Sequence, residues 1–261
     1  MKLRVITVTR GDSPYWPDAS ASVAAAVPDA EHVVVCPPAQ AGAVARPGGI
    51  VLPEVGPGLY PNLNHGLGAL PQDWDAFTWL NDDDRLQPEG FAALVAEFRR
   101  RADVDVMFGR VALIDGRGGR VGTLPVARRG QDLAALFGRG IIPFAQPGTV
   151  IRRSWWERLR RFDPSYGLAA DMDFFVRALV GGARFAFFDA EVAEFRLRAG
   201  QLSKRTDEAE LETARALAPL RGAPGGTGAL LRFRLANLPA YAERLRRHGW
   251  KSMREIYESV T

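Results

Sequence analysis

Short apolar runs alternate with helical patterns along residues 1–205. Leu3 to Thr9 is one such run, Ala19 to Ala26 carries a helical pattern, and Val33 to Val35 is a second run. A strand, a helix and a strand in this order predict a right-handed crossover and a parallel sheet. Continuous apolar runs are typical of strands covered on both faces. We therefore expect an α/β fold, with a Rossmann-like, mainly parallel sheet flanked by helices.

The same patterns predict most of the remaining elements. Pro88 to Arg101 is expected to be an amphipathic helix, and Ser154 is expected to cap a helix through Arg160, with Glu157 completing a capping box. Gly and polar residues interrupt the apolar stretches 104–114 and 185–197, so each stretch is expected to form two strands. The expected strands beyond the first two are 50–52, 77–80, 104–108, 111–114, 149–151, 185–188 and 192–197, and the expected further helices are 132–136, 168–179 and 207–217.

The composition changes after Ser203. A charged helical pattern is followed by a Gly- and Pro-rich stretch, 222–228, and then by a basic helical segment from Leu230 to the end. We expect one domain over residues 1–205 and a helical C-terminal appendage over 206–261. Leucines among arginines in this tail are explained by packing on the domain, by a homodimer contact or by a peripheral contact with an anionic membrane.

The overall composition is that of a globular protein and excludes several classes. The chain has 261 residues, of which 47% are hydrophobic and 25% charged. A single cysteine, Cys36, rules out an internal disulfide and favours a reducing compartment. Lys2 to Thr9 are expected to form a strand and not the apolar core of a secretion signal, and no apolar run approaches membrane-spanning length. The net charge of +4 comes without a nucleic-acid-binding motif or zinc-ligand spacing. We expect a cytoplasmic protein that does not bind nucleic acid.

Three consecutive carboxylates, Asp82, Asp83 and Asp84, follow the apolar run at 77–80. Burial of unpaired charges is costly, so these acids are expected at the end of the strand, in a crevice or in water. In an open α/β sheet, ligands bind at this edge. Because adjacent carboxylates repel, a divalent cation, ribose hydroxyls or an arginine should meet them. A polar turn before the helix at Pro88 explains the same residues equally well.

Two further acids, Asp171 and Asp173, interrupt the apolar helix at 168–179. A carboxylate beside an apolar neighbour such as Phe174 has a raised pKa, which suits a general base. The alternative is that acids near a helix N-terminus are simply favoured by the helix dipole. Asp173 is placed to pair with Arg177 four residues later, which is a structural role.

Several motifs follow one another in a fixed order: Thr9-Arg10-Gly11, Gly58-Leu59-Tyr60 with Asn64 and Gly66, Trp79 to Asp84, Gly148 to Ser154, Ala170 to Phe174, and Phe195-Arg196-Leu197. In this order the chain resembles the family 2 glycosyltransferases with the GT-A fold, in particular those of bacterial surface-polysaccharide assembly. The resemblance covers residues 1 to about 203. It implies inverting transfer of a sugar from a nucleotide-sugar donor to an acceptor hydroxyl, commonly with magnesium or manganese.

The resemblance implies roles for the acidic residues. Asp171 matches the catalytic base of the family. Asp84 matches the residue that faces the metal, and Asp82 or Asp83 matches the residue at the ribose. The segment 143–146 matches an acceptor-side loop, which places Gln146 near the acceptor. The acceptor itself is expected to be a glycan or a lipid-linked molecule, so the protein is expected to work in the cytoplasm or at the inner face of the membrane.

A donor-side segment also matches the family. Tyr60 and Asn64 stand at donor-side positions, and the family often has a lysine where this chain has His65, and an aspartate where it has Pro61. The resemblance therefore implies that Tyr60, Asn64 and His65 lie near the nucleotide or the sugar. For His65, a capping or surface role is equally compatible with the sequence.

Two departures from the family affect the donor site. Cys36 stands where the family usually has an aspartate that reads the nucleobase, so base recognition is expected to fall to Thr9 and Arg10. Arg198 stands where the family often has a histidine that completes the metal site. Arginine does not ligate metals, so Arg196 and Arg198 are expected to neutralise the diphosphate directly. The alternative is that a magnesium or manganese ion neutralises it.

Two other functions fit part of the pattern. A nucleotidyltransferase also presents acids at strand ends, although Arg10-Gly11-Asp12 is a poor match to the phosphate loop of that class. A catalytically degenerate nucleotide-sugar-binding protein is consistent with Cys36, Pro61 and Arg198 at the positions of family residues.

Overall fold

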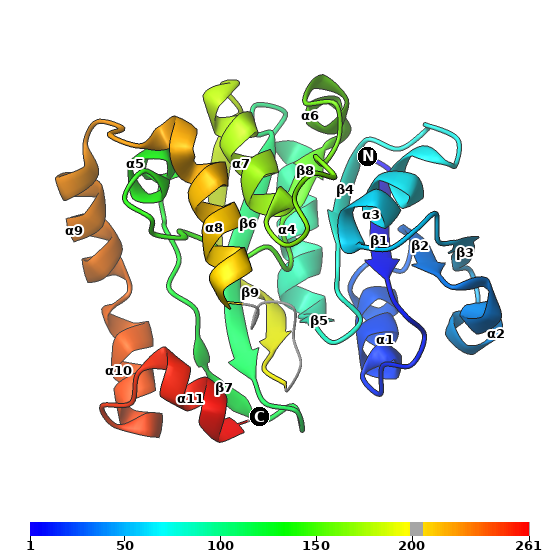
Figure 1. Ribbon diagram of the computed structural model, residues 1–261, viewed down its shortest axis with the longest axis horizontal. Helices are drawn as coiled ribbons and strands as arrows, with labels where there is room; N and C mark the ends of the chain where they lie inside the picture. Colours follow the sequence, from blue (N-terminus) through cyan, green and yellow to red (C-terminus); the bar gives the residue numbers. More distant parts are fainter. Residues whose placement is uncertain (199–205, 261) are drawn as a thin grey trace.

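The computed structural model describes residues 1–198 and 206–260 (Figure 1). Its strands are β1 (Leu3–Val8), β2 (Glu31–Cys36), β3 (Ile50–Pro53), β4 (Ala76–Trp79), β5 (Arg85–Leu86), β6 (Val106–Ile114), β7 (Arg120–Thr123), β8 (Val150–Arg152) and β9 (Phe185–Arg196). They form one sheet in the order β3-β2-β1-β4-β8-β6-β9-β5, with β7 paired to β6. The pairs β1–β2, β1–β4, β2–β3 and β6–β9 are parallel. The predicted α/β fold is confirmed.

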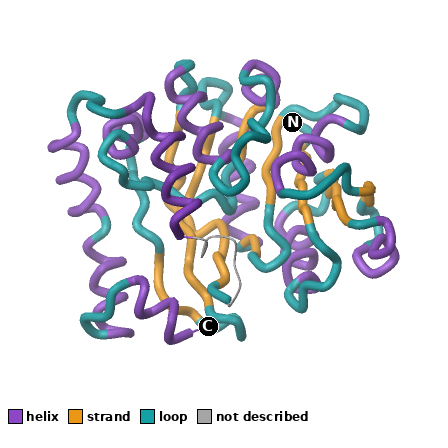
Figure 2. The backbone as a smooth tube through the Cα atoms, viewed as in Figure 1, coloured by secondary structure: helices purple, strands orange, loops and turns teal. Residues whose placement is uncertain are grey.

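Helices cover both faces of the sheet. They are α1 (Trp16–Ala26), α2 (Ala41–Val44), α3 (Leu59–Gly68), α4 (Pro88–Arg100), α5 (Leu133–Phe137), α6 (Arg153–Arg158), α7 (Ala170–Val180), α8 (Thr206–Leu217), α9 (Gly226–Ala236), α10 (Leu238–His248) and α11 (Met253–Val260), with short 3₁₀ turns at Pro38–Gln40, Gly130–Asp132 and Ala218–Leu220. Figures 1 and 2 show β2 and β3 at one end of the molecule and α9 and α10 at the other.

Alternate residues of the strands enter two separate cores. Val5 packs with Trp16 of α1 and Phe91 of α4 on one face. Its neighbour Ile6 packs with Leu63 of α3 on the other face, in a core that α5, α7, α8 and α9 also enter. This is the two-residue period of a strand that is buried on both sides. Because β1, β2 and β4 are parallel, their carboxyl ends lie at the same edge of the sheet.

Two stretches predicted as pairs of strands are continuous. β6 and β9 each run through the expected break, with shifts of register near Gly109 and Arg110. A Cβ at Gly109 would lie 2.6 Å from a methyl carbon of Val192 and 2.8 Å from the carbonyl oxygen of Ala190. The glycine therefore marks a close approach of two paired strands, not the end of one.

The predicted capping role of Ser154 is wrong. α6 begins at Arg153, one residue earlier, and its N-cap residue makes no side-chain hydrogen bond. The N–H of Arg153 donates to the carbonyl of Asp75 at 2.9 Å, so the neighbouring chain satisfies this first amide of the helix. Glu157 pairs with Arg153 and completes no capping box.

The C-terminal helices pack on the rest of the chain. Phe233 of α9 and Leu217 of α8 belong to the same core as α3 and α7. The buried amide of Asn237 accepts from the N–H of Val126 at 2.9 Å and donates to its carbonyl at 3.0 Å. The domain boundary predicted at residue 206 stays a prediction. None of the helices in the described ranges is long and apolar enough to cross a membrane.

Candidate active site

Asp82 follows β4, and Thr9 links it to the ends of the two neighbouring strands β1 and β2. The hydroxyl of Thr9, just after β1, donates to its carboxylate at 2.5 Å, and the N–H of Thr9 donates to the carbonyl of Val35 in β2 at 3.0 Å. Burial raises the pKa of Asp82, and the hydrogen bond from Thr9 opposes that rise. Thr9 therefore holds Asp82 at the edge predicted for the donor. Arg10, the next residue, is exposed.

Asp83 meets a cation, as expected for one of three adjacent acids. It is 5% exposed, and its carboxylate accepts a hydrogen bond from Nε of Arg198. The side chain of Arg198 is itself 33% exposed. The position of the family histidine thus carries a permanent positive charge that reaches both Asp83 and solvent.

Asp84 lies at the predicted strand end but has no exposed surface. One carboxylate oxygen accepts the backbone N–H of Arg196 at 2.9 Å, and the other accepts the side-chain amide of Asn81 at 3.2 Å. Burial, followed by the charge of Asp83, raises the pKa of Asp84 well above its usual value. The expectation of a crevice or water is therefore wrong for this residue, because two donors and a raised pKa reduce the cost of its burial.

Each of the three acids is engaged with another group of the protein. Both oxygens of Asp84 are engaged, Asp83 is paired with Arg198, and Asp82 is bonded to Thr9. Within residues 1–198 and 206–260, no group of three or more His, Cys, Asp or Glu side chains is placed to hold a metal ion. The metal role of Asp84 stays a prediction.

Arg196 is buried behind the acids, with 1% of its surface exposed. Its Nε donates to the carbonyl of Asp83 at 2.8 Å, and Nη1 lies 3.3 Å from the carbonyls of Asp115 and Gly116. Its guanidinium also lies over the ring of Tyr15. Arg196 therefore holds the acidic turn against the turn between β6 and β7. Its predicted contact with the diphosphate stays a prediction.

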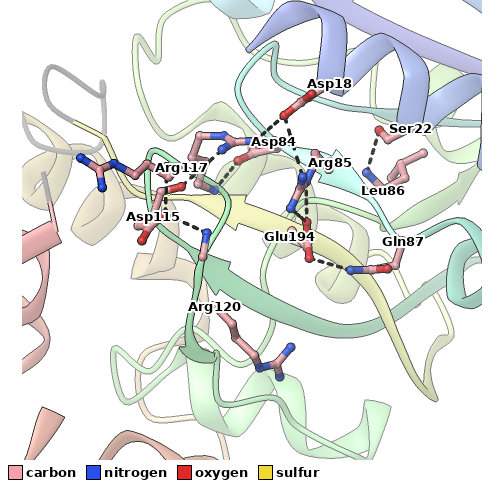
Figure 3. A network of polar contacts seen from close by, with 12 residues as sticks. Asp18, Ser22, Asp84, Arg85, Leu86, Gln87, Asp115, Arg117, Arg120 and Glu194 are labelled. Carbon is pink, nitrogen blue, oxygen red and sulfur yellow. Dashed lines mark hydrogen bonds and ion pairs between the residues drawn. The ribbon is translucent and has the colours of Figure 1, made fainter. Parts of the chain in front are cut away.

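The short strand β5 fixes the other end of the acidic turn. Arg85 pairs with Glu194 of β9 at 2.5 Å and with Asp18 of α1 at 3.8 Å, and Gln87 donates to Glu194 at 2.7 Å. Figure 3 shows Asp84 beside this chain of ion pairs. Sequence reasoning missed β5, because two residues carry no period and the partner lies 109 residues away.

Asp171 lies in the first turn of α7 and is held by Tyr60 of α3. The Tyr60 hydroxyl donates to Asp171 Oδ1 at 3.0 Å and also lies 2.9 Å from the carbonyl of Leu168. The N–H of Met172 donates to the same carboxylate oxygen at 2.8 Å. Burial raises the pKa of Asp171, and the hydrogen bonds oppose this rise. The direction is the one predicted for a general base. Asp173, by contrast, is bonded to Nε of Arg177 at 2.7 Å, the structural pair expected from spacing.

The first turn of α7 lies at the same edge of the sheet as the acids. The ring of Phe175 stacks on Trp79 of β4, with centroids 6.2 Å apart, and Phe174 meets Phe77 edge-on at 6.3 Å. α7 leads directly into β9, which is parallel to β6. Because β4 and β6 are both antiparallel to β8, β9 runs in the same direction as β4 and starts at the opposite edge. α7 therefore starts toward the edge where β1 and β4 end (Figure 1). Asp171 is in the first turn of α7 and so lies on the side of the carboxyl edge.

Two asparagines shape the donor-side segment. Asn62, which sequence reasoning missed, donates to the carbonyls of Gly56 and Gly58, both at 2.8 Å, and so builds the loop after β3. Asn64 bonds both the carbonyl and the N–H of Phe162, at 2.8 and 3.0 Å. Its amide therefore ties α3 to the chain before α7, and its predicted contact with the donor stays a prediction.

Three other predicted positions lie around this edge. His65 is partly exposed, and its buried Nε2 has no hydrogen-bond partner within the described residues. Cys36 ends β2 and is buried, and burial raises the pKa of its thiol. Gln146 donates to the carbonyl of Trp79 at 2.7 Å and so supports the end of β4. The predicted contacts of His65 with the donor and of Gln146 with the acceptor stay predictions.

Comparisons with known proteins agree on the fold and the family. The sequence profile of the glycosyl transferase family group 2 matches residues 76–205, about half of the chain. No curated protein sequence matches. The solved structure of TarS from S. aureus matches with a TM-score of 0.63 and 17% identity over 98% of this chain. This chain spans 45% of the length of that TarS chain.

Two ligand complexes match as well. TarS 1-349 with UDP-GlcNAc has a TM-score of 0.61 and 17% identity, over 95% of this chain and 72% of that one. The mannosyltransferase PcManGT from Pyrobaculum calidifontis, with GDP-Man and Mn²⁺, has a TM-score of 0.59 and 16% identity, over 92% and 75%. At these identities the structural likeness shows the fold, and the family follows from the sequence profile. The chain therefore belongs to the family 2 glycosyltransferases and has their GT-A fold.

Proposed function

We propose that this glycosyltransferase moves a sugar from a nucleotide-sugar donor to an acceptor hydroxyl with inversion, and that Asp171 is the general base. The environment of Asp171 carries the proposal. Asp171 has a pKa raised by burial, is oriented by Tyr60, and lies at the same sheet edge as the acidic turn. A carboxylate in such a position takes a proton more readily than one in water. The matched structures of TarS and PcManGT contain nucleotide sugars, which supports this class of donor.

The reaction is a single displacement. The carboxylate of Asp171 takes the proton of the acceptor hydroxyl, whose oxygen attacks the anomeric carbon from the side opposite the leaving group. The bond between that carbon and the diphosphate oxygen breaks, and its electron pair leaves with the nucleoside diphosphate. Negative charge grows on the diphosphate in the transition state, so a fixed cation there lowers the barrier. Arg198 is the candidate cation, because part of its side chain reaches solvent beside Asp83.

The acceptor is proposed to be a glycan or lipid-linked molecule of bacterial surface-polysaccharide synthesis. The helical tail supports this through exposed side chains on α9 and α10. Leu231, Leu235 and Leu238 are each exposed by 56–59%, and Arg234 is exposed among them. Trp250 beyond α10 is 93% exposed. Apolar and basic side chains on one helical surface are typical of peripheral contact with anionic lipid.

The central test is Asp171→Asn. Asparagine keeps the shape and accepts the bond from Tyr60 but does not take a proton, so we expect turnover to fall at least about 100-fold. Binding of the nucleoside diphosphate, measured by calorimetry with and without Mn²⁺, should stay within about twofold. The control is Asp173→Asn on the same helix, which should keep activity.

Each other outcome has a definite meaning. Near-normal turnover of Asp171→Asn would remove Asp171 as the base. Release of pyrophosphate by the wild-type protein would indicate a nucleotidyltransferase. A wild-type protein that binds nucleotide sugars and turns none over would be a degenerate binding protein.

A further inference from the structure

A carboxylate of the C-terminal helix α8 is bonded to the turn that leads into α7. Glu212 of α8 accepts hydrogen bonds from three consecutive backbone amides, those of Gly167, Leu168 and Ala169, at 2.8, 2.7 and 2.9 Å. Asp171 follows two residues later. The contact joins segments more than 40 residues apart in the chain.

The three amides need an acceptor of this kind. All three precede α7, which begins at Ala170 with Ala169 as its N-cap residue, so no carbonyl of the helix accepts from them. The partial positive charge of a helix N-terminus also favours a carboxylate. In agreement, these three N–H groups lower the pKa of Glu212, although burial acts in the opposite direction.

The same turn contributes to the position of the base. The carbonyl of Leu168, whose N–H is bonded to Glu212, lies 2.9 Å from the Tyr60 hydroxyl. That hydroxyl also donates to Asp171. A continuous path of hydrogen bonds thus runs from Glu212 through the backbone of Leu168 and the Tyr60 hydroxyl to the carboxylate.

We propose that Glu212 is a positioning residue for the transfer reaction: by holding the turn 167–169, it fixes Tyr60 and Asp171 in the arrangement that takes the acceptor proton. This inference rests on the proposed function. Under it, the C-terminal helix α8 is needed for the chemical step, although its composition differs from that of the preceding residues.

The test compares two glutamates of α8. Glu210 is exposed on the same helix, so Glu210→Ala makes the same change in charge and composition as Glu212→Ala without touching the turn. Hydrogen exchange of the amides 167–169 reports directly on the contact. Glu212→Ala should lose their protection, and Glu210→Ala should retain it.

Kinetics then separate positioning from general support of the fold. We expect Glu212→Ala to lower kcat at least about tenfold, with binding of the nucleoside diphosphate unchanged within about twofold, and to move the acidic limb of the pH–rate profile. Glu212→Gln keeps an acceptor oxygen and should recover a large part of kcat. Melting curves of all variants establish that they are folded at the assay temperature.

The results have separate consequences. If Glu212→Ala changes the hydrogen exchange of the amides 167–169 but has the kcat and pH profile of Glu210→Ala, the contact exists but does not position the base. That result would overturn the inference. If exchange does not change either, the contact itself is refuted. If the wild-type protein transfers no sugar and binds no nucleoside diphosphate from a panel of UDP, GDP, ADP, CDP and dTDP, the proposed function falls, and this inference falls with it.

Discussion

Tyr60→Phe removes one hydroxyl and tests how the base is tuned. The hydroxyl stabilises the charged form of Asp171 through a 3.0 Å hydrogen bond and so lowers a pKa that burial raises. Without it the pKa of Asp171 rises further. The base is active when deprotonated, so the acidic limb of kcat/KM should move to higher pH and the alkaline side should not change.

The size of the effect follows from the geometry. A hydrogen bond to a charged group contributes about 1.5–3 kcal/mol, and about 1.4 kcal/mol corresponds to one unit of pH. The single hydroxyl hydrogen serves two acceptors, the carboxylate of Asp171 at 3.0 Å and the carbonyl of Leu168 at 2.9 Å. We therefore take the lower end: the midpoint of the limb should rise by about one pH unit, and the rate well below it should fall about tenfold.

The assay is release of nucleoside diphosphate across a pH series, with the donor first identified by thermal shift. Tyr166→Phe is the control, because Tyr166 is also a buried tyrosine of this core but contacts the side chain of Arg215. A midpoint for Tyr60→Phe that matches that of Tyr166→Phe, or that moves to lower pH, would refute the coupling between Tyr60 and the base.

Two further predictions concern stability and location. Asp84 has a raised pKa in the folded protein, so its stabilising effect is present below the unfolded pKa of about 3.9 and is lost as pH rises through the folded pKa. Asp84→Asn should therefore raise the melting temperature by at least about 2 °C at pH 7.5, and by less at pH 4. A melting temperature at pH 7.5 equal to or below that of wild type would contradict this. Flotation with vesicles containing phosphatidylglycerol should carry the wild-type protein, and replacement of Leu231 and Leu235 by Ser should reduce it severalfold, whereas the exposed Leu211→Ser on α8 should not. Equal flotation of both variants, or flotation with neutral vesicles only, would end the membrane proposal.

Most regular elements could be predicted because the apolar pattern of each is local. The run at Val33 to Val35 and the face of α4 with Phe91 and Leu94 are buried as their periods predict. The break inside β6 was predicted wrongly, because a glycine that allows two strands to approach closely looks the same in the sequence as a glycine that ends a strand. The break inside β9 was predicted at Asp189 to Glu191, whose two acids the strand carries without interruption.

The site could be predicted only where its residues carry a local signal. The acids at 82–84 and Asp171 stand out because charge interrupts an apolar pattern. Asn62, Arg85 and Glu212 give no such signal, because an asparagine in a helix or a glutamate on a charged helix is ordinary. Their roles come from backbone groups or side chains that only the folded chain brings to them, up to 109 residues away.

The composition shift after Ser203 records which side chains are exposed and does not by itself define a separate unit. The outer faces of α8 and α9 are charged and solvated, and this is what the composition records. Their inner faces enter the core shared with α3 and α7 through residues such as Leu217 and Phe233. Because composition averages over both faces, it does not distinguish a separate appendage from a helical layer that covers one side of a sheet. Without that layer, the three amides bonded to Glu212 would lose their acceptor two residues before the proposed base.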